Sequence, residues 1–302
     1  GPLLLGQPTL FYEGGFTIDS LCQIVKEYNV TNLAGAPTAY RMMLAADQQQ
    51  MQKLRGQFRV VSSAGEPLNP EVIRWFDQVL DAPIYDHYGQ TEVGMVVCNH
   101  HGLAHEVKAG SAGFASLGYR IVTLDEQGNE LPSDTPGILA VDLEQSPMMW
   151  FGGYEESRKS PFVKHYYLTG DTAEMHADGS MSFVGRSDDV ITTSGYRIGP
   201  FDVESALLEH EAVIEAAVIG VPDPERTEIV KAFVVLADQE LASDQLAETL
   251  SQFVKKRLSA HAYPRLVEFV TELPKTPSGK IQRFLLRNQE IEKQKVKLNA
   301  AS

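Results

Sequence analysis

The stretch from Gly185 to Glu204 combines side chains that could do chemistry with turn residues that would expose them. Its sequence, GRSDDVITTSGYRIGPFDVE, places arginines, paired aspartates and glycines around a short apolar segment. Cations can neutralise phosphoryl oxygens, and carboxylates can hold a metal ion. Such a mixture is not typical of a protein core. Taken alone, the stretch also fits a charged turn between two domains, because Asp and Gly mostly mark loops.

The same stretch predicts the elements that would position these charges. An apolar Val-Ile pair indicates a strand, Ser194-Gly195 a turn, and Tyr196 to Ile198 a second strand. Pro200 then suits the first turn of a helix, where its missing N–H costs nothing. We therefore expect a strand-turn-strand-helix unit whose charged residues stay at the surface.

Four further motifs contain the same kinds of residue. They are SAGEPLNPEV at Ser63 to Val72, YDHYGQTEVG at Tyr85 to Gly94, YYLTGDTAE at Tyr166 to Glu174 and LPKTPSGKIQR at Leu273 to Arg283. In this order and spacing, the five motifs resemble adenylate-forming enzymes: acyl-CoA synthetases, peptide-synthetase adenylation domains and firefly-type luciferases. The resemblance covers nearly all of the chain. The run from Ala262 and the FYEGGF segment most resemble acyl-CoA synthetases for acetate-like to medium-chain acids.

The resemblance implies an acid-thiol ligase that uses ATP, Mg²⁺ and coenzyme A. A carboxylate would be activated as an acyl-adenylate and then transferred to coenzyme A, with release of pyrophosphate and AMP. The first step spreads charge over phosphoryl oxygens, which a metal and cations must neutralise. Two alternatives remain: a peptide-synthetase type that loads a carrier protein, and an inactive nucleotide-binding fragment. No carrier-domain serine motif follows Lys280, which disfavours the first alternative.

The resemblance also assigns roles to residues around the nucleotide. Glu92 corresponds to the magnesium ligand, and Thr91 to the catalytic hydroxyl on the α-phosphate. Asp171 resembles the carboxylate that accepts both ribose hydroxyls. The full set implied to bind the nucleotide is Gly65, Glu66, Pro67, Asp86, His87, Tyr88, Gly89, Gln90, Thr91, Asp171, Arg186 and Arg197.

Other implied roles concern the reacting groups and a moving domain. Lys280 would bridge the attacking carboxylate and the α-phosphate as the catalytic lysine. Asp188 corresponds to the hinge, and Gly195 to the hairpin that faces coenzyme A after rotation. Gly35 and Ala36 would leave room in the acyl pocket for a chain longer than acetyl.

Composition limits the class of protein. The chain has 302 residues, 43% of them hydrophobic, and a formal net charge of −14. Nucleic-acid-binding proteins normally carry a basic surface, so nucleic acid is not an expected partner. The apolar runs are strand-sized, which predicts no membrane span. Two cysteines provide no disulfide framework and favour a reduced, cytoplasmic setting. The oligomeric state and the identity of the acid stay open.

Hydrophobic patterns divide the chain into three parts. Residues 1–112 alternate short strands with helices, which predicts part of a parallel α/β subdomain for nucleotide and acid. Residues 113–187 contain short strands, among them Gly137 to Asp142, and Gly/Pro/Asp turns, as in a small antiparallel β-barrel. Residues 188–302 would form a mobile α+β domain that carries Lys280. No Ser/Thr/Gly-rich phosphate loop ending in lysine is found, so we expect an incomplete enzyme that is inactive alone.

Particular segments carry these expectations. Expected strands in the first part are Leu10 to Tyr12, Thr31 to Ala34, Arg59 to Ser62 and Pro83 to Asp86, with helices near 17–28, 38–47 and 70–80. In parallel sheets ligands bind beyond the carboxyl ends of strands, where two of the motifs fall. Cys98, His100, His101 and His105 crowd together in a segment that we expect to be a loop, but their spacing fits no common zinc motif, and we expect no metal there.

Overall fold

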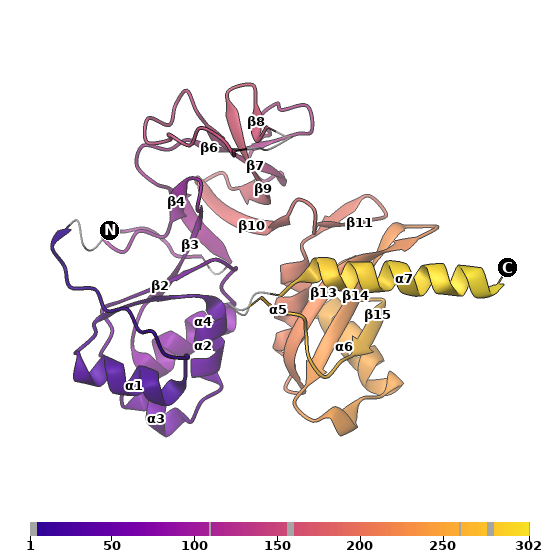
Figure 1. The fold of residues 1–302 in the computed structure, drawn as a ribbon, viewed down its shortest axis with the longest axis horizontal. Helices are drawn as coiled ribbons and strands as arrows, with labels where there is room; N and C mark the ends of the chain where they lie inside the picture. The colour runs from indigo at the N-terminus through magenta and orange to yellow at the C-terminus, as the bar shows by residue number, and fades with distance from the viewer. Residues whose placement is uncertain (1–4, 109, 156–159, 260, 277–280, 302) are drawn as a thin grey trace.

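A computed structural model describes residues 5–108, 110–155, 160–259, 261–276 and 281–301, with side chains described up to residue 293. The chain forms a ten-stranded sheet followed by a five-stranded sheet. Figure 1 shows three parts around a common centre: helices with β1 to β3, a second group of strands above them, and the five-stranded sheet to one side.

The first part is a parallel α/β unit. Its elements are α1 (Ile18–Glu27), β1 (Asn32–Gly35), α2 (Pro37–Leu44), α3 (Gln48–Gln52), β2 (Val60–Ala64), α4 (Pro70–Trp75), η2 (Phe76–Leu80) and β3 (Ile84–Gln90). β1 pairs with β2 and β2 with β3, both in parallel. The carboxyl ends of β2 and β3 therefore meet at one edge of the sheet, where the predicted motifs lie.

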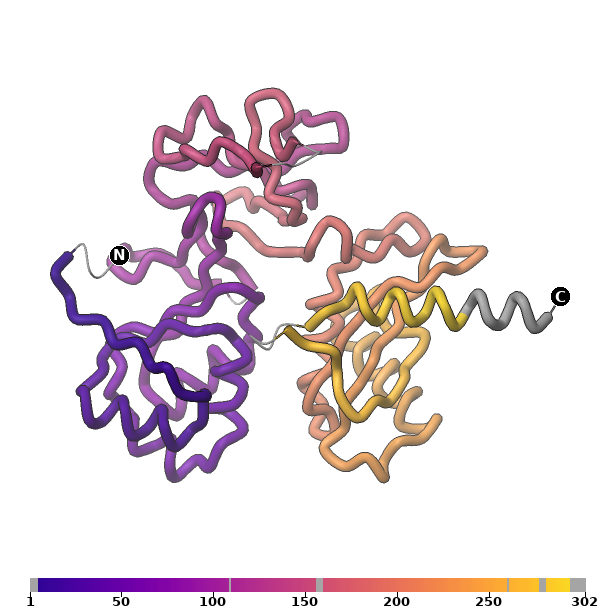
Figure 2. The backbone as a smooth tube through the Cα atoms, in the orientation of Figure 1, coloured from indigo at the N-terminus to yellow at the C-terminus, as the bar shows by residue number. Residues whose placement is uncertain are grey.

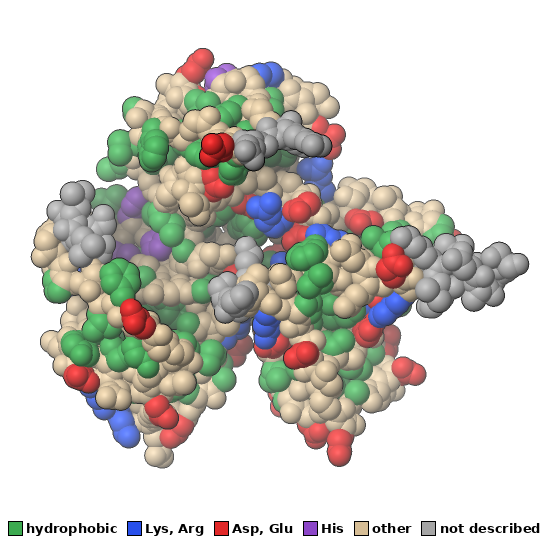
Figure 3. All heavy atoms as spheres, viewed as in Figure 1, with side chains coloured by type: hydrophobic (Ala, Val, Ile, Leu, Met, Phe, Trp, Pro, Cys, Tyr) green, Lys and Arg blue, Asp and Glu red, His purple; other side chains and the backbone are tan. Residues whose placement is uncertain are grey.

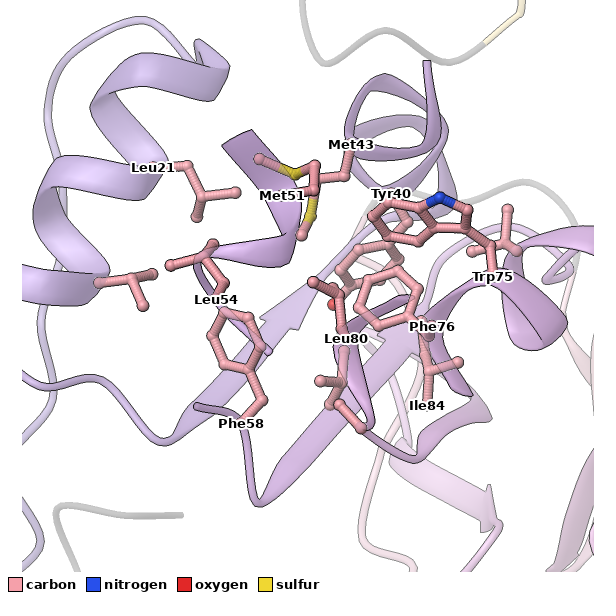
Figure 4. Close-up of a cluster of buried hydrophobic side chains, with 14 of the residues drawn as sticks. Leu21, Tyr40, Met43, Met51, Leu54, Phe58, Trp75, Phe76, Leu80 and Ile84 are labelled. Carbon is pink, nitrogen blue, oxygen red and sulfur yellow. The ribbon is translucent and has the colours of Figure 1, made fainter. Parts of the chain in front are cut away.

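Local sequence signals explain where the helices begin. Thr17 and Ser20 form a reciprocal capping box at α1. Pro37 and Pro70 occupy first-turn positions in α2 and α4, and the Asn69 side chain caps α4 by accepting the Glu71 N–H. The helices bury a continuous apolar cluster against the strands. Figure 4 shows Leu21 of α1, Met51 of α3 and Leu54 in one cluster with Phe76 and Leu80 of η2 and Ile84 of β3.

The middle of the chain continues the same sheet in antiparallel fashion. Its strands are β4 (Gly94–Cys98), β5 (Ser111–Ala115), β6 (Ile121–Leu124), β7 (Gly137–Asp142), β8 (Phe162–Val163), β9 (Tyr166–Met175) and β10 (Ser180–Arg186). The strand order is β1-β2-β3-β4-β5-β10-β9-β7-β6, and β8 pairs with β9. This hydrogen-bonded path ends at β6, so closure into a barrel is not confirmed.

The last part is a second, mostly antiparallel sheet with helices. Its elements are β11 (Ile191–Thr193), β12 (Tyr196–Ile198), α5 (Pro200–Leu208), β13 (Val213–Asp223), β14 (Thr227–Leu236), η3 (Gln239–Leu241), α6 (Asp244–Arg257), β15 (Leu266–Phe269) and α7 (Arg283–Ala301). The strand order is β12-β11-β14-β13, and β15 pairs in parallel with β14. The predicted strand-turn-strand-helix unit is confirmed, with Ser194 and Gly195 both at positive φ in the turn.

Three sequence-based expectations are wrong in detail. Residues 10–12 form no strand, because no strand of the described part of the chain pairs with them, and Phe11 is 82% exposed on this segment, which leads into α1 (Figure 2). Cys98 ends β4 instead of lying in a loop. The charges of the 185–204 stretch do not all stay at the surface: the Asp189 side chain is only 11% exposed, because two arginines of α7 pair with it. Within the described ranges, no helix is long and apolar enough to cross a membrane.

Candidate active site

A cavity of about 1070 Å³ lies where the three parts meet. Its walls come from the ends of β2 and β3, from β9 and β10, and from α5, β13 and the segment before α7. Figure 3 shows acidic and basic side chains around the hollow between these parts. Most of the residues proposed from the motifs line this cavity: Gly65, Glu66, Pro67, Asp86, His87, Tyr88, Gly89, Gln90, Thr91, Glu92, Asp171 and Arg186.

Asp171 is the centre of a polar cluster in this cavity. The residue lies in β9 and is only 4% exposed. Tyr88 Oη donates to Asp171 Oδ2 at 2.6 Å, and Gln90 Nε2 donates to the same oxygen at 2.9 Å. Arg186 Nη1 lies 3.2 Å from Asp171 Oδ1. Burial, followed by the nearby Asp171 charge, raises the pKa of Tyr88, so the tyrosine stays a hydrogen-bond donor at neutral pH.

The loop after β2 forms the opposite wall. Gly65 has φ +96°, a conformation that other residues adopt only with strain. Arg41 Nη2 lies 3.3 Å from Glu66 Oε2 and donates to Thr38 Oγ1 at 2.9 Å. The loop is thereby tied to α2. Sequence reasoning missed Arg41 and Thr38, which lie outside the five motifs.

Asp86 and His87 lie on β3 next to this loop. The Leu68 N–H donates to Asp86 Oδ2 at 3.1 Å, while Asp86 Oδ1 is buried with no hydrogen-bond partner among the described residues. Burial raises the pKa of Asp86 from its ordinary value to about 7. Burial and the neighbouring His101 lower the pKa of His87 to about 4. Near neutral pH this corner of the cavity therefore carries less charge than its sequence indicates.

A pH-dependent stability should follow from Asp86. Its folded pKa of about 7 exceeds the ordinary carboxyl value of 3.8, so its stabilising contribution is full below pH 3.8 and is lost as pH rises through 7. As pH rises between these values, we expect the free energy of unfolding of wild type to fall relative to that of the Asp86→Asn variant, by up to about 1.4 kcal/mol per pH unit. Urea unfolding of both proteins across this range measures the difference, and parallel pH profiles would contradict the assignment.

Glu92 and Thr91 follow β3 directly. Tyr154 Oη donates to Glu92 Oε1 at 2.7 Å, while Thr91 is exposed at the cavity. A Cβ at Gly89 would lie 2.2 Å from the Gly94 carbonyl oxygen, so this tight return of the chain requires glycine. Glu92 lines the cavity, and its second oxygen takes no part in the hydrogen bond to Tyr154. One such carboxylate fits Mg²⁺, which takes few protein ligands and completes its coordination with phosphates and water.

The helices α5 and α7 beside the five-stranded sheet complete the cavity with an ion-pair network. Arg283 Nε and Nη2 donate to the two oxygens of buried Glu204 at 3.0 and 2.7 Å, and the Val218 N–H donates to Glu204 Oε1 at 2.8 Å. Arg287 pairs with Asp189 and donates to the Asp188 carbonyl oxygen at 2.8 Å. Sequence reasoning gave no role to Glu204, the last residue of the Gly185–Glu204 stretch, or to Arg287, which lies outside the five motifs.

Several predicted residues lie away from the cavity. Arg197 is exposed and lies 3.5 Å from Glu126, and Gly195 is exposed in its turn. Asp188 pairs with Arg186 at 3.5 Å but is not among the lining residues. Gly35 lines a smaller neighbouring pocket, and Ala36 lines neither. Lys280 lies outside the described residues.

Comparison with known proteins identifies the family. The sequence model described as AMP-binding enzyme matches residues 1–149, and the AMP-binding enzyme C-terminal domain matches residues 202–280. The chain is 44% identical over 281 residues to the mitochondrial acyl-coenzyme A synthetase ACSM4 of Rattus norvegicus, covering 91% of this chain and 48% of the relative. The chain belongs to the AMP-binding enzyme family and spans about half the length of the curated relatives it matches.

Solved structures of related enzymes share the fold. The Brucella canis acyl-CoA synthetase is 63% identical with a TM-score of 0.63, and the match covers 97% of this chain and 54% of that one. A benzoate CoA ligase from Burkholderia xenovorans LB400 is 36% identical with a TM-score of 0.81, covering 95% of this chain and 57% of that one. The mixed α/β architecture is therefore that of adenylate-forming enzymes.

Proposed function

We propose that this chain is part of an acyl-CoA synthetase that activates a carboxylic acid with ATP and transfers the acyl group to coenzyme A. The observation that carries the proposal is the convergence of Tyr88, Gln90 and Arg186 on buried Asp171 in a cavity between the two sheets. The names of the related acyl-CoA synthetases and CoA ligases support the same reaction.

In this proposal Asp171 accepts the ribose hydroxyls of the nucleotide. Its position is held by Tyr88 and Gln90, and Arg186 is near enough to contact a phosphate as well. Gly65 to Pro67, Asp86 and Tyr88 enclose the adenine between two strand ends, where backbone groups are directed outward. His87 lies at the boundary between the main cavity and the smaller pocket next to it. The buried Asp86 Oδ1 that lacks a described partner could accept a hydrogen bond from the adenine amino group.

Glu92 would hold Mg²⁺ beside the phosphates, and Thr91 would donate its hydroxyl to the α-phosphate. The metal supplies charge neutralisation for the developing phosphoryl charge when it is bound. Lys280 would approach the same phosphate as the catalytic lysine. Electrostatic positioning of this kind contributes mainly through preorganised charge.

The segment 188–302 would act as a mobile domain about Asp188, with 1–112 and 113–187 as the subdomains of a fixed body. The relative with 63% identity has a lower TM-score than the relative with 36% identity, which a change of domain orientation would produce. Rotation would replace the Lys280 segment with the hairpin of Gly195 and Arg197, which the resemblance assigns to coenzyme A and the nucleotide. A cytoplasmic location and closure of strands β5 to β10 into a barrel belong to the same proposal.

Binding of a stable acyl-adenylate mimic tests the proposed function. An acyl-sulfamoyl-adenosine, which cannot react with a thiol, should bind the chain and should compete with AMP in calorimetric titration. The matched guanosine compound should bind much more weakly, because its purine edge reverses the donor and acceptor expected opposite Asp86. Failure to bind the adenosine compound, or equal binding of both compounds, would contradict the proposal.

A further inference from the structure

A small side pocket opens next to the main cavity. It has a volume of about 310 Å³, and its surface is mostly apolar. The lining residues are Ala34, Gly35, Ser62, Ser63, Ala64, His87, Met95 and Cys98. Ala64, His87 and Met95 also line the main cavity, so the two spaces adjoin. A molecule bound in the cavity beside Asp171 could therefore extend a short chain into this pocket.

Two polar side chains of the side pocket, those of His87 and Ser63, have no hydrogen-bond partner in the described parts of the chain. For His87 this holds for both ring nitrogens, of which Nδ1 is fully buried, and Ser63 Oγ is likewise buried, beside Asp86. Two other polar groups of the lining are already engaged. Ser62 Oγ lies 3.3 Å from His101 Nε2, and Cys98 Sγ lies 3.3 Å from Ser116 Oγ. An imidazole without partners is costly in a folded protein unless a ligand or water pairs with it.

The side pocket offers no charge to balance a charged ligand. Its lining contains no Asp, Glu, Lys or Arg among the described residues. Burial and His101 lower the pKa of His87 to about 4, so the imidazole is neutral at physiological pH. Moving an unpaired carboxylate or ammonium into such a site is strongly unfavourable. An uncharged hydroxyl can instead donate to, or accept from, either tautomer of a neutral imidazole.

We propose that the acid activated here carries an uncharged hydroxyl group on its acyl tail, which hydrogen-bonds to His87 in the side pocket. The inference rests on the proposed function and narrows its substrate class. Apolar atoms of Ala34, Ala64 and Met95 contact the methylene part of the tail, while His87 distinguishes a hydroxyl from a methyl group of similar size. Dicarboxylic and amino acids are excluded by the cost of burying their second charge.

Matched acyl-sulfamoyl-adenosines test this substrate class on the chain itself. The pairs are 4-hydroxybutyryl with pentanoyl and 3-hydroxybutyryl with 3-methylbutyryl, since a hydroxyl replaces a methyl of similar size in each. We expect at least one hydroxylated member to bind about fivefold tighter than its partner, because one net hydrogen bond contributes about 1 kcal/mol. The succinyl compound should bind more weakly than every uncharged member.

Three variants assign any preference to His87. His87→Leu removes the hydrogen bond at similar volume and should abolish the hydroxyl preference, whereas His87→Gln should restore part of it. Met95→Leu changes the same pocket without changing its hydrogen bonds, so it should alter both members of a pair equally. Thermal unfolding of each variant confirms that it is folded.

The possible results distinguish failure of the hydroxyl-acid inference from failure of the proposed function. Three results would overturn the inference alone. They are equal affinity for the methyl and hydroxylated members of both pairs, tight binding of the succinyl compound, and a hydroxyl preference that survives His87→Leu. Absence of binding by every adenosine compound would overturn the proposed function, and the inference with it.

Discussion

Replacing Arg283 with methionine should lower the free energy of unfolding by about 3 to 5 kcal/mol, since it leaves a buried carboxylate without its counter-charge. Arg283 makes two hydrogen bonds to Glu204, whose side chain is 7% exposed. The remaining Val218 N–H cannot balance a full charge in this environment. Urea unfolding at neutral pH measures the loss.

Two companion variants distinguish the ion pair from simple loss of packing. Glu204→Gln combined with Arg283→Met should recover part of the stability, because removing both charged partners is much less costly than removing one. Arg257→Met removes an arginine whose side chain is 57% exposed and pairs with Glu209 at 3.0 Å. That variant should lose no more than about 1 kcal/mol. Equal losses for Arg257→Met and Arg283→Met would show that burial of the pair has no special effect.

Replacing Asp171 with asparagine should weaken binding of an acyl-sulfamoyl-adenosine by about a hundredfold. The amide keeps the shape of the carboxylate but loses its charge and one acceptor position. If Asp171 accepts both ribose hydroxyls, two charge-assisted hydrogen bonds are affected, each worth about 1.5 to 3 kcal/mol. Calorimetric titration of the variant gives the affinity directly.

A dideoxyribose analogue shows whether the ribose is the group that Asp171 contacts. Wild type should lose most of its affinity for the analogue, whereas Asp171→Asn should lose little more than it has already lost. Asp178→Asn is a matched control, since Asp178 lies on the turn after β9 and pairs with Lys108 at the surface. If Asp171→Asn lost as much affinity from removal of the ribose hydroxyls as wild type does, the ribose would not be in contact with Asp171.

Local sequence signals predicted most of the elements correctly. Pro200 begins α5 as predicted, since proline suits the first turn of a helix and fits poorly inside one. The turn at Ser194-Gly195 and the strand Gly137–Asp142 also follow from residues that are adjacent in the chain. The segment Leu10 to Tyr12 shows the limit of such signals. It has strand-forming residues, but a strand also needs a hydrogen-bonding neighbour, and no strand among the described residues pairs with it.

The sequence motifs predicted most of the polar residues of the cavity, and the same motifs indicated the family. Only the folded chain decided which of these residues meet. Tyr88 reaches Asp171 across 83 positions, and Arg283 reaches Glu204 across 79. The structure also decided that the Asp189 carboxylate is covered by two arginines of α7 and that His87 lies in a pocket without charges. Periodicity reports which face of an element is buried, whereas pairing of distant side chains depends on strand order and on the contact between two sheets. Those are properties of the tertiary structure.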